Sequence, residues 1–473
     1  MNLHNDSELT ISRLAPLLRR RKLSPVELTR WILERINRLQ PRINAYITVT
    51  SDLALKHARQ AEREIAKNGY RGPLHGIPIS LKDLFHTRGV RTTGGSTILR
   101  RFMPTEDAPV VGRMFDAGAV LIGKTNLHEF AYGATNVNLH YGAVRNPWDL
   151  ERMSGGSSGG SAASVSAGLS LASLGTDTGG SIRIPAAACG CVGLKPTHGF
   201  SPLSGVIPLA PSLDHVGPLC RCVADVGLIL NAIAGLNEDG GSGPAGLAVP
   251  FNREIREGVK GLHIGIPRQY FFDRIDVRLK SLVLTAIEVF EELGAEVHEV
   301  NLEQMQETAL LAGVITVAEA LTYHRKWLEK RAGDYDPAIR ARMEASRNLT
   351  AVEYLLAQEK RRSYGAAFER SMRTVDLLAV PSLPVFAPRI DDKLVTSGRS
   401  REDVRMALLR LTRPANLTGL PAISIPCGFS KAGLPAGLQL IGQRWGEATL
   451  LRAAWAYEQA TPWHRQFPQL LDL

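Results

Sequence analysis

Two serines in glycine-rich segments are the residues of this sequence that most directly suggest chemistry. Ser157 is the centre of a G-x-S-x-G match at residues 155–159. This pattern often marks a nucleophilic serine at a sharp turn between a strand and a helix. Such a turn needs an apolar strand before the serine, whereas residues 146–152 are polar and typical of a turn. We therefore expect a glycine-rich loop at the N-terminus of a helix, where backbone amides favour negative charge.

A second glycine-serine loop presents a better-placed serine. Residues 175–183 (GTDTGGSIR) follow an apolar run at 169–174. Gly179 and Gly180 allow a tight backbone that directs several N–H groups at one point. This arrangement suits an oxyanion hole with Ser181 at its mouth. A flexible linker is the alternative, but a linker does not need an aspartate and an arginine around its serine.

A lysine at the end of an apolar segment is a candidate base. Residues 76–81 (GIPISL) predict a buried strand, and Lys82 and Asp83 follow it. Burial lowers the pKa of a lysine, because a charged ammonium is costly to desolvate, and the neutral amine can then accept a proton. The alternative is an outward-facing lysine paired with Asp83. Considered alone, Lys82 favours that alternative, but the two serine loops beside it favour chemistry.

Two further segments resemble known binding motifs, but neither meets all the requirements of its motif. Residues 118–125 fit the phosphate-loop pattern G-x-x-x-x-G-K-[ST], yet the four middle residues, AVLI, predict a buried strand where a loop is required. We expect no nucleotide site there and place Lys124 and Thr125 in the turn after the strand. His128 begins an H-E-x-x-H zinc pattern, which fails because Tyr132 occupies the second histidine position. We therefore expect no metal and no cofactor.

Composition restricts the class of protein. The chain has 473 residues, 44% hydrophobic and 22% charged, which is typical of one large or two moderate globular domains. No apolar run approaches the roughly 18 residues of a membrane span, and the N-terminal MNLHNDSELT lacks the pattern of a secretory signal. The net charge of +10 is spread over the chain. We expect a basic surface that does not bind nucleic acid directly, even at the densest basic run, residues 19–22.

Cysteine usage favours a cytoplasmic location. Five cysteines, an odd and low number, suit a reducing compartment. Four of them form two C-x-C pairs, which are spaced more tightly than the usual C-x-x-C of zinc sites. We expect all five to be small buried residues; they are Cys189, Cys191, Cys220, Cys222 and Cys427.

Helical and strand patterns alternate along the chain and predict an α/β fold with a largely parallel sheet covered by helices. Ser24 and Pro25 predict the start of a helix that ends at about Leu39. Residues 240–252 are rich in glycine and proline and predict a linker, while 303–374 are helical and highly charged. The other expected helices are 51–67, 110–116, 161–168, 277–293 and 448–460, and the other expected strands are 119–122, 263–266, 295–300, 377–380, 422–425 and 437–441.

The segments with chemistry resemble the amidase signature family of serine hydrolases. The matching segments cover most of residues 70–235 and recur near 415–445; they are GIPISLKD, GKTNLHEFAYG, NPWDLERMSGGSSGGSAA, GTDTGGSIRIPAAACGCVGLKPT, SLDHVGPL and NLTGLPAISIPCGF. The resemblance implies a large twisted mixed β-sheet covered on both faces by α-helices. It also implies a single domain over 1–473, with an N-terminal helical region (1–69), a catalytic core (70–235) and a helical lid that sets specificity (303–374).

The resemblance also implies a role for each candidate residue. Ser181 is the nucleophile, Lys82 the base, and Ser157, with a cis peptide bond, carries the proton between them. Ser181 attacks an amide carbonyl, the proton returns to the leaving amine, and water resolves the acyl-enzyme. No histidine is needed. The implied oxyanion donors are the N–H groups of Thr178, Gly179, Gly180 and Ser181, and the implied supporting residues are Ser158, Asp177 and Arg183.

The motifs indicate the reaction more clearly than they indicate which amide is the substrate. The family includes the A subunit of the tRNA-dependent amidotransferase, which releases ammonia from glutamine for a partner subunit. Residues 357–358 and Arg361 agree with that protein, which has a glutamine-binding arginine there. Leu409 aligns instead with one of its aspartates, and residues 318–324 (AEALTYH) stand where it has R-Y-D-G-x-R-Y-G. These departures favour a stand-alone amidase.

Three functions therefore remain open from the sequence. The first is a hydrolase of a small-molecule amide that works alone or as a homodimer, without a membrane. The second is the glutaminase A subunit of an amidotransferase. The third, a noncatalytic scaffold, is disfavoured because a scaffold has no reason to keep the lysine and both serines.

Overall fold

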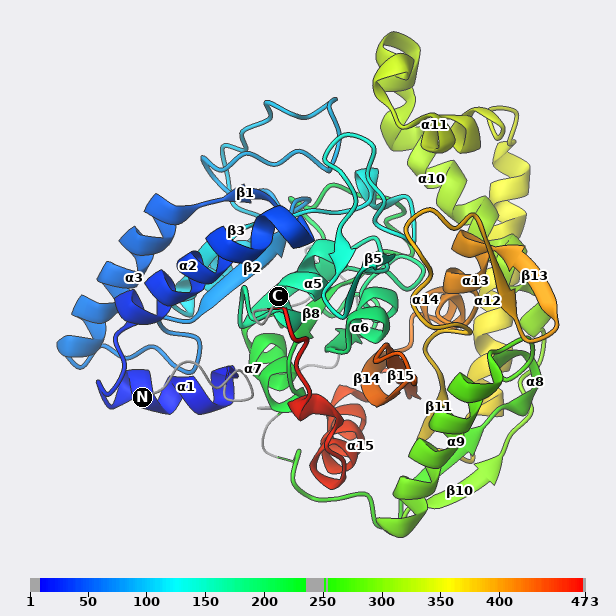
Figure 1. Cartoon of the computed structure of the whole chain (residues 1–473). Coiled ribbons are helices and arrows are strands. Elements are labelled where there is room, and N and C mark those ends of the chain that lie inside the picture. The colour runs from blue at the N-terminus through cyan, green and yellow to red at the C-terminus, as the bar shows by residue number, and fades with distance from the viewer. Residues whose placement is uncertain (1–8, 235–250, 252–253, 471–473) are drawn as a thin grey trace.

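A mixed sheet of eleven strands runs through the computed structural model, which describes residues 9–234, 251 and 254–470 (Figure 1). In spatial order the strands are β1 (Tyr46–Val49), β3 (Val120–Thr125), β2 (Pro78–Lys82), β6 (Ala172–Thr176), β8 (Val216–Cys220), β7 (Val192–Lys195), β14 (Ala422–Phe429), β15 (Pro435–Gly442), β11 (Leu377–Pro381), β9 (His263–Ile266) and β10 (Glu296–Glu299).

The sheet is mixed, as the family resemblance implies. Four neighbouring pairs are parallel and six are antiparallel. The largely parallel sheet expected from helix and strand alternation is therefore wrong. The reason lies in the middle of the sheet, where every pair from β6 to β11 is antiparallel and β14 is joined to β15 by a short hairpin.

Helices cover both faces of this sheet. A side chain placed on Gly437 of β15 would meet Ala187, whereas one placed on Gly442 would meet Leu450. These glycines are five residues apart on one strand and so face opposite sides. The helices are α1 (Ile11–Arg19), α2 (Pro25–Ile43), α3 (Ser51–Ala66), α4 (Pro109–Asp116), α5 (Gly159–Ser166), α6 (Arg183–Cys189), α7 (Val223–Ile233), α8 (Arg268–Phe271), α9 (Val277–Glu292), α10 (Thr308–Arg331), α11 (Pro337–Glu344), α12 (Ala351–Ser371), α13 (Val404–Arg410), α14 (Arg413–Thr418) and α15 (Glu447–Ala460). Two small hairpins, β4 (Arg145–Asn146) with β5 (Asp149–Met153) and β12 (Leu394–Ser397) with β13 (Ser400–Asp403), complete the fold.

Most of the expected elements are present, with shifted ends. Helix α2 begins after Ser24, whose Oγ accepts the N–H groups of Val26 and Glu27, but it continues past Leu39 to Ile43. A proline in the last turn removes only one hydrogen bond, and the extra turn buries Ile43 before a left-handed cap at the next residue.

The charged helical region predicted at 303–374 comprises α10, α11 and α12 (yellow-green to yellow in Figure 1). Except for Phe251, the predicted linker at 240–252 lies outside the described residues. Among the helices that the structure describes, none is both long and apolar enough to cross a membrane. All five cysteines are buried and free, as expected.

A buried ion pair holds the segment that follows β2. Lys124 is fully buried in β3, and its Nζ lies 3.3 Å from Oδ1 of Asp83. It also donates hydrogen bonds to the carbonyl of Phe85 and to the hydroxyl of Thr92. The turn predicted at Lys124 is therefore wrong, because these partners allow the strand to continue with its lysine inside the protein. Asp83 thus pairs with Lys124 and not with the adjacent Lys82, which excludes the outward-facing alternative for that lysine.

This pair gives a stability prediction. Lys124→Met leaves the Asp83 carboxylate buried without its cation, so we expect a loss of about 3–5 kcal/mol in the free energy of unfolding, measured by urea denaturation. Lys56→Met, at an exposed position of α3, is the matched control and should change it by less than about 0.5 kcal/mol. A Lys124→Met variant as stable as the control would show that the pair does not anchor this segment.

Candidate active site

The candidate base and the first candidate serine are in direct contact. Lys82 is the last residue of β2 and is fully buried. Its Nζ lies 2.7 Å from Oγ of Ser157 and 2.8 Å from Oγ1 of Thr176, both within hydrogen-bond distance. Strand β6, which ends at Thr176, is the neighbour of β2 in the sheet, so the ends of two parallel strands bring these groups together.

The environment of Lys82 favours its neutral form. Burial lowers its pKa to about 7, although the carboxylates of Asp177 and Asp214 oppose this shift. A neutral amine has a lone pair, so the hydroxyl of Ser157 can donate its hydrogen bond to Nζ. A lysine in this state can act as a general base near neutral pH.

Ser157 lies in a compact loop that precedes α5, as the sequence predicts. The peptide bond between Gly156 and Ser157 is cis. The Ser157 carbonyl accepts a hydrogen bond from the N–H of His128 at 3.2 Å. A side chain on Gly156 would have its Cβ 2.7 Å from the backbone nitrogen of Asn136, so only glycine fits at this close approach.

Ser181 lies in the loop between β6 and α6. Its side chain is almost fully buried, and its carbonyl accepts the N–H of Ser158 at 3.2 Å, which ties the two serine loops together. Gly180 has φ of +130°, and a Cβ on it would approach Oγ1 of Thr412 to 2.1 Å. This position therefore requires glycine on both conformational and steric grounds.

The predicted oxyanion donors differ in what they contact. The N–H of Gly180 donates to Oδ1 of Asp177 at 2.7 Å, so in this geometry it is not free to bind an oxyanion. The remaining predicted donors are the N–H groups of Thr178, Gly179 and Ser181. The Thr178 hydroxyl donates to Asp214 at 2.5 Å, which fixes this side of the loop.

A buried ion pair organises the Ser181 loop. Nη2 of Arg183 lies 3.0 Å from Oδ1 of Asp177, and both side chains are fully buried. Burial alone would raise the pKa of Asp177, but the Arg183 charge and its hydrogen bonds lower it to about 2. Arg183 also donates to Gln439 of β15, to Asn416 of α14 and to the carbonyl of Thr412. The loop is thus fixed to two distant segments of the chain.

Ser158, the third predicted supporting residue, is also buried. Its Oγ donates to the carbonyl of Thr176 at 3.1 Å. The structure thus brings together Lys82, both serine loops and the predicted supporting residues. It adds Thr176, which sequence reasoning missed although it ends an apolar strand just as Lys82 does.

Three arginines lie close to this site without an ion-pair partner among the described residues. Cζ of Arg342 lies 5.0 Å and Cζ of Arg405 5.8 Å from the ring centre of Tyr132. Arg413 is 7% exposed, and within the described part of the chain its guanidinium has no hydrogen-bond partner. A side chain on Gly179 would have its Cβ 3.6 Å from Cγ of Arg413, so this arginine lies beside the oxyanion loop.

The charges of this arginine cluster (Arg342, Arg405 and Arg413) act on one another and on the serine loops. Burial, followed by the charge of Arg405, lowers the pKa of both Arg342 and Arg413 to about 10. Burial together with Arg342, Arg405 and Lys82 lowers the pKa of His128 to about 3. The cluster is therefore a cationic environment that reaches His128, whose N–H donates to the carbonyl of Ser157. Sequence reasoning missed it because its members come from three separate helices.

Two other residues named from the sequence have clear positions. Leu409 is buried beside the oxyanion loop, since a Cβ on Gly179 would lie 3.3 Å from its Cδ2. Arg361 donates to the carbonyls of Leu417 and Ser212, each at 2.8 Å, so it connects α12 to α14 and to the loop that contains Ser212. A groove with a volume of about 1090 Å³ lies between α10, α12 and residues 208–212.

Residues that could hold a metal ion lie far from these groups. In the described ranges one such cluster occurs, formed by His263, Glu296 and His298 on β9 and β10. Six strands separate β9 from β2, a distance on the order of 30 Å. The sequence did not reveal this cluster, because His263 is distant in sequence from the other two and only strand pairing brings them together.

Comparison with known proteins identifies the family. The family model described as "Amidase" matches residues 27–451. The chain is 40% identical over 482 residues to the A subunit of the glutamyl-tRNA(Gln) amidotransferase of Geobacter sp. (strain M21), covering 97% of this chain and 98% of that protein. Two solved structures are similar over nearly their whole length.

The first belongs to a study of "an unexpected vestigial protein complex" and the origins of an s-triazine catabolic enzyme. It has a TM-score of 0.91 and 33% identity, over 95% of this chain and 98% of that one. The second is the A subunit of the glutamyl-tRNA(Gln) amidotransferase of Thermotoga maritima, with a TM-score of 0.81 and 34% identity, over 98% of this chain and 97% of that one. The match of the family model over most of the sequence, together with these relatives, shows that the chain belongs to the amidase family, also called the amidase signature family.

Proposed function

We propose that this protein hydrolyses the C–N bond of a carboxylic amide through an acyl-enzyme on Ser181, with Ser157 and Lys82 as the proton relay. The observation that carries the proposal is the 2.7 Å contact between a fully buried lysine and Ser157. A buried lysine without a carboxylate ion pair is costly, and a structural role would not require it at the meeting point of two serine loops.

In this mechanism each proton transfer has a defined donor and acceptor. The neutral Nζ of Lys82 accepts the proton of Ser157 as Ser157 accepts the proton of Ser181, and Ser181 Oγ attacks the carbonyl carbon. The N–H groups of Thr178, Gly179 and Ser181 stabilise the oxyanion. The proton returns through Ser157 to the leaving nitrogen, which departs as ammonia or an amine. Water then enters and cleaves the ester by the same relay.

The comparisons favour a specific role, the glutaminase A subunit of a tRNA-dependent amidotransferase. Relatives named as the A subunit of glutamyl-tRNA(Gln) amidotransferase are 39–41% identical to this chain over nearly its full length. We therefore propose that the protein releases ammonia from glutamine and works with a protein partner. This role has more support than the stand-alone amidase that the sequence motifs favour.

A stand-alone amidase remains the second candidate, because one observation favours it. Leu409 lies beside Gly179 in the oxyanion loop, at the position that aligns with an aspartate of the amidotransferase protein. A carboxylate there can bind the ammonium group of glutamine, whereas a leucine cannot. The cationic arginine cluster would in addition repel an ammonium group.

Both candidates share one feature of the substrate, a carboxylate. Asp336 and Asp403 are the acids whose charges reach Arg342 and Arg405, but their oxygens accept N–H groups at the starts of α11 and α13. The arginines are thus left with unpaired charge next to the serine loops. Arginine binds a carboxylate through paired hydrogen bonds, so an amide with a carboxylate would relieve their repulsion.

The first prediction concerns the relay. Ser181→Ala should lower kcat for any amide substrate by roughly 10⁴–10⁶-fold. Ser157→Ala and Lys82→Met should lower kcat almost as much, because the three residues act as a unit and the loss of one disables the others. Ammonia release by the purified variants measures this. Ser363→Ala, at an exposed position of α12, is the control and should retain full activity. A Ser181→Ala variant with more than a tenth of the wild-type rate would refute the assignment of the nucleophile.

The second prediction follows from the lowered pKa of Lys82. Its folded-state pKa of about 7 means that the amine is protonated, and inactive as a base, at lower pH. We therefore expect kcat/KM to fall about tenfold for each pH unit below 7 and to level off above it. A pH–rate profile from 5.5 to 8.5, with circular dichroism to confirm folding, measures this. A rate that is constant down to pH 5.5 would contradict a lysine base.

The third prediction uses three amides that share one carbon chain. Glutaramate carries a carboxylate, glutamine adds an ammonium group, and pentanamide has neither charge. Arg413→Met should lower kcat/KM for glutaramate by roughly 10–100-fold and leave pentanamide almost unchanged, because one charge-assisted hydrogen bond contributes about 1.5–3 kcal/mol.

Arg370→Met, exposed on α12, is the matched control and should leave all three rates unchanged. Equal losses for glutaramate and pentanamide would refute a carboxylate subsite. In the wild type, glutamine as the best of the three favours the amidotransferase role, and glutaramate as the best favours the stand-alone amidase.

A further inference from the structure

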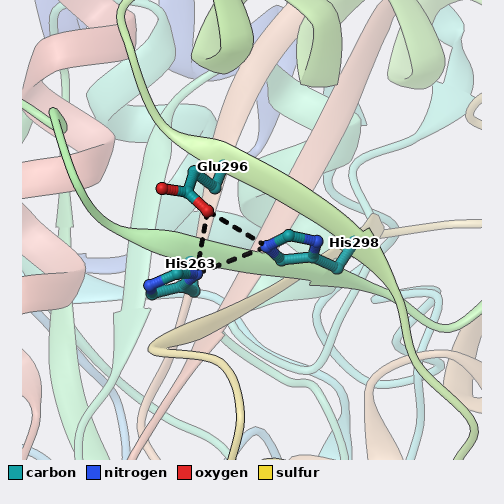
Figure 2. A group of neighbouring side chains, drawn as sticks. All are labelled: His263, Glu296 and His298. Carbon is teal, nitrogen blue, oxygen red and sulfur yellow. Dashed lines mark hydrogen bonds and ion pairs between the residues drawn. The ribbon is translucent and has the colours of Figure 1, made fainter.

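A separate group of side chains lies at the far edge of the sheet. His263 is on β9, and Glu296 and His298 are on the edge strand β10 (Figure 2). The two strands are parallel, with Glu296 opposite His263 and His298 opposite Gly265. Residues paired in this way, and residues two apart on a strand, point to the same face of a sheet. The pairing therefore gathers all three side chains on one face.

The three nearest donor atoms form an almost equilateral triangle. Nδ1 of His263 lies 3.3 Å from Nε2 of His298, and Oε2 of Glu296 lies 3.6 Å from each of these nitrogens. A point therefore exists about 2.0 Å from all three atoms, which equals the usual zinc–nitrogen and zinc–oxygen bond lengths. Figure 2 shows the three groups directed at this common point.

Hydrogen bonds between the side chains explain this arrangement poorly. Neutral imidazoles can form one hydrogen bond across the 3.3 Å separation, but the carboxylate oxygen is too far from either ring for a normal hydrogen bond. The rings are nearly parallel, with an interplanar angle of 21°. Three lone pairs at equal distance from one point are better satisfied by a cation than by one another.

The backbone holds this arrangement in place. The N–H of His263 donates to Oδ2 of Asp376 at 2.8 Å, and its carbonyl accepts the N–H of Asp376 at 2.7 Å. His263 is thus fixed on the side away from β10. The side chains of His263, Glu296 and His298 are about half exposed, so an ion could enter directly and complete its coordination with water.

We propose that His263, Glu296 and His298 bind a divalent zinc ion that joins the two outermost strands of the sheet. Two imidazoles and one carboxylate are a donor set that zinc accepts, and the open positions are taken by water. The ion covers part of the exposed edge strand and stabilises the folded state by binding to it in preference to the unfolded chain. It takes no part in amide chemistry, because the site is separated from Lys82 by most of the sheet.

Isothermal titration of the purified, metal-free full chain with zinc chloride tests the proposal. We expect one zinc ion per chain and a rise in melting temperature on addition of zinc. Glu296→Gln and His298→Ala should each weaken binding at least tenfold and remove the temperature shift. Both residues are largely exposed, so without metal the two variants should have the same melting temperature as the wild type. Cobalt substitution gives a second readout, a visible absorption band of tetrahedral cobalt in the wild type that is absent from both of these variants.

Glu299→Gln is the matched control, since residue 299 is on the same strand and points to the opposite face. It should bind zinc like the wild type. The proposal is overturned if the wild type takes up no zinc, or if Glu296→Gln and His298→Ala bind it as tightly as the wild type does. Amide turnover is not used in this test, so its result is independent of the proposed function.

Discussion

The buried ion pair between Asp177 and Arg183 is the interaction on which the candidate site depends. The Asp177 carboxylate accepts the N–H groups of Gly180 and Ile182, and so gives the Ser181 loop its shape. Arg183 connects the same loop to α14 and β15, which lie more than 200 residues further along the chain. A pair buried this deeply is costly to form, and its full set of hydrogen bonds offsets that cost. The ion pair holds the Ser181 loop in one conformation, in which Ser181 lies beside the Ser157 loop.

The second constraint is the burial of Lys82. Strand pairing carries this lysine into the interior, where its amine lies within hydrogen-bond distance of two hydroxyl groups. The adjacent Asp83 is occupied by Lys124, so it cannot neutralise Lys82 as an ion-pair partner. Lys124 therefore forms a structural ion pair with Asp83, whereas Lys82 is left with the hydroxyl groups of Ser157 and Thr176. In the proposed relay Lys82 takes the place of the histidine that many serine hydrolases use, since a lysine of lowered pKa can perform the same proton transfer.

Features of the protein that depend on a local pattern could be predicted from the sequence. The glycine-serine loops, the lysine at a strand end and most elements could be read from the residues, because each has a local signature. The strand directions in the middle of the large sheet could not be predicted in this way. They depend on which segments pair, and the alternation of helices and strands alone suggested parallel strands. The arginine cluster was missed for the same reason: Arg342, Arg405 and Arg413 belong to three helices that only tertiary packing brings together. The metal-binding residues on β9 and β10 likewise share no sequence signature.

The most direct test of the proposed relay is to locate the reactive serine. A fluorophosphonate probe forms a stable bond with an activated serine, and trypsin should release both candidate serines in one peptide, residues 153–183. Tandem mass spectrometry of that peptide assigns the adduct to one of them. The proposed relay predicts a single adduct on Ser181 in the wild type and none in Lys82→Met. An adduct on Ser157, or labelling of Ser181 that persists without the lysine, would contradict the proposed relay.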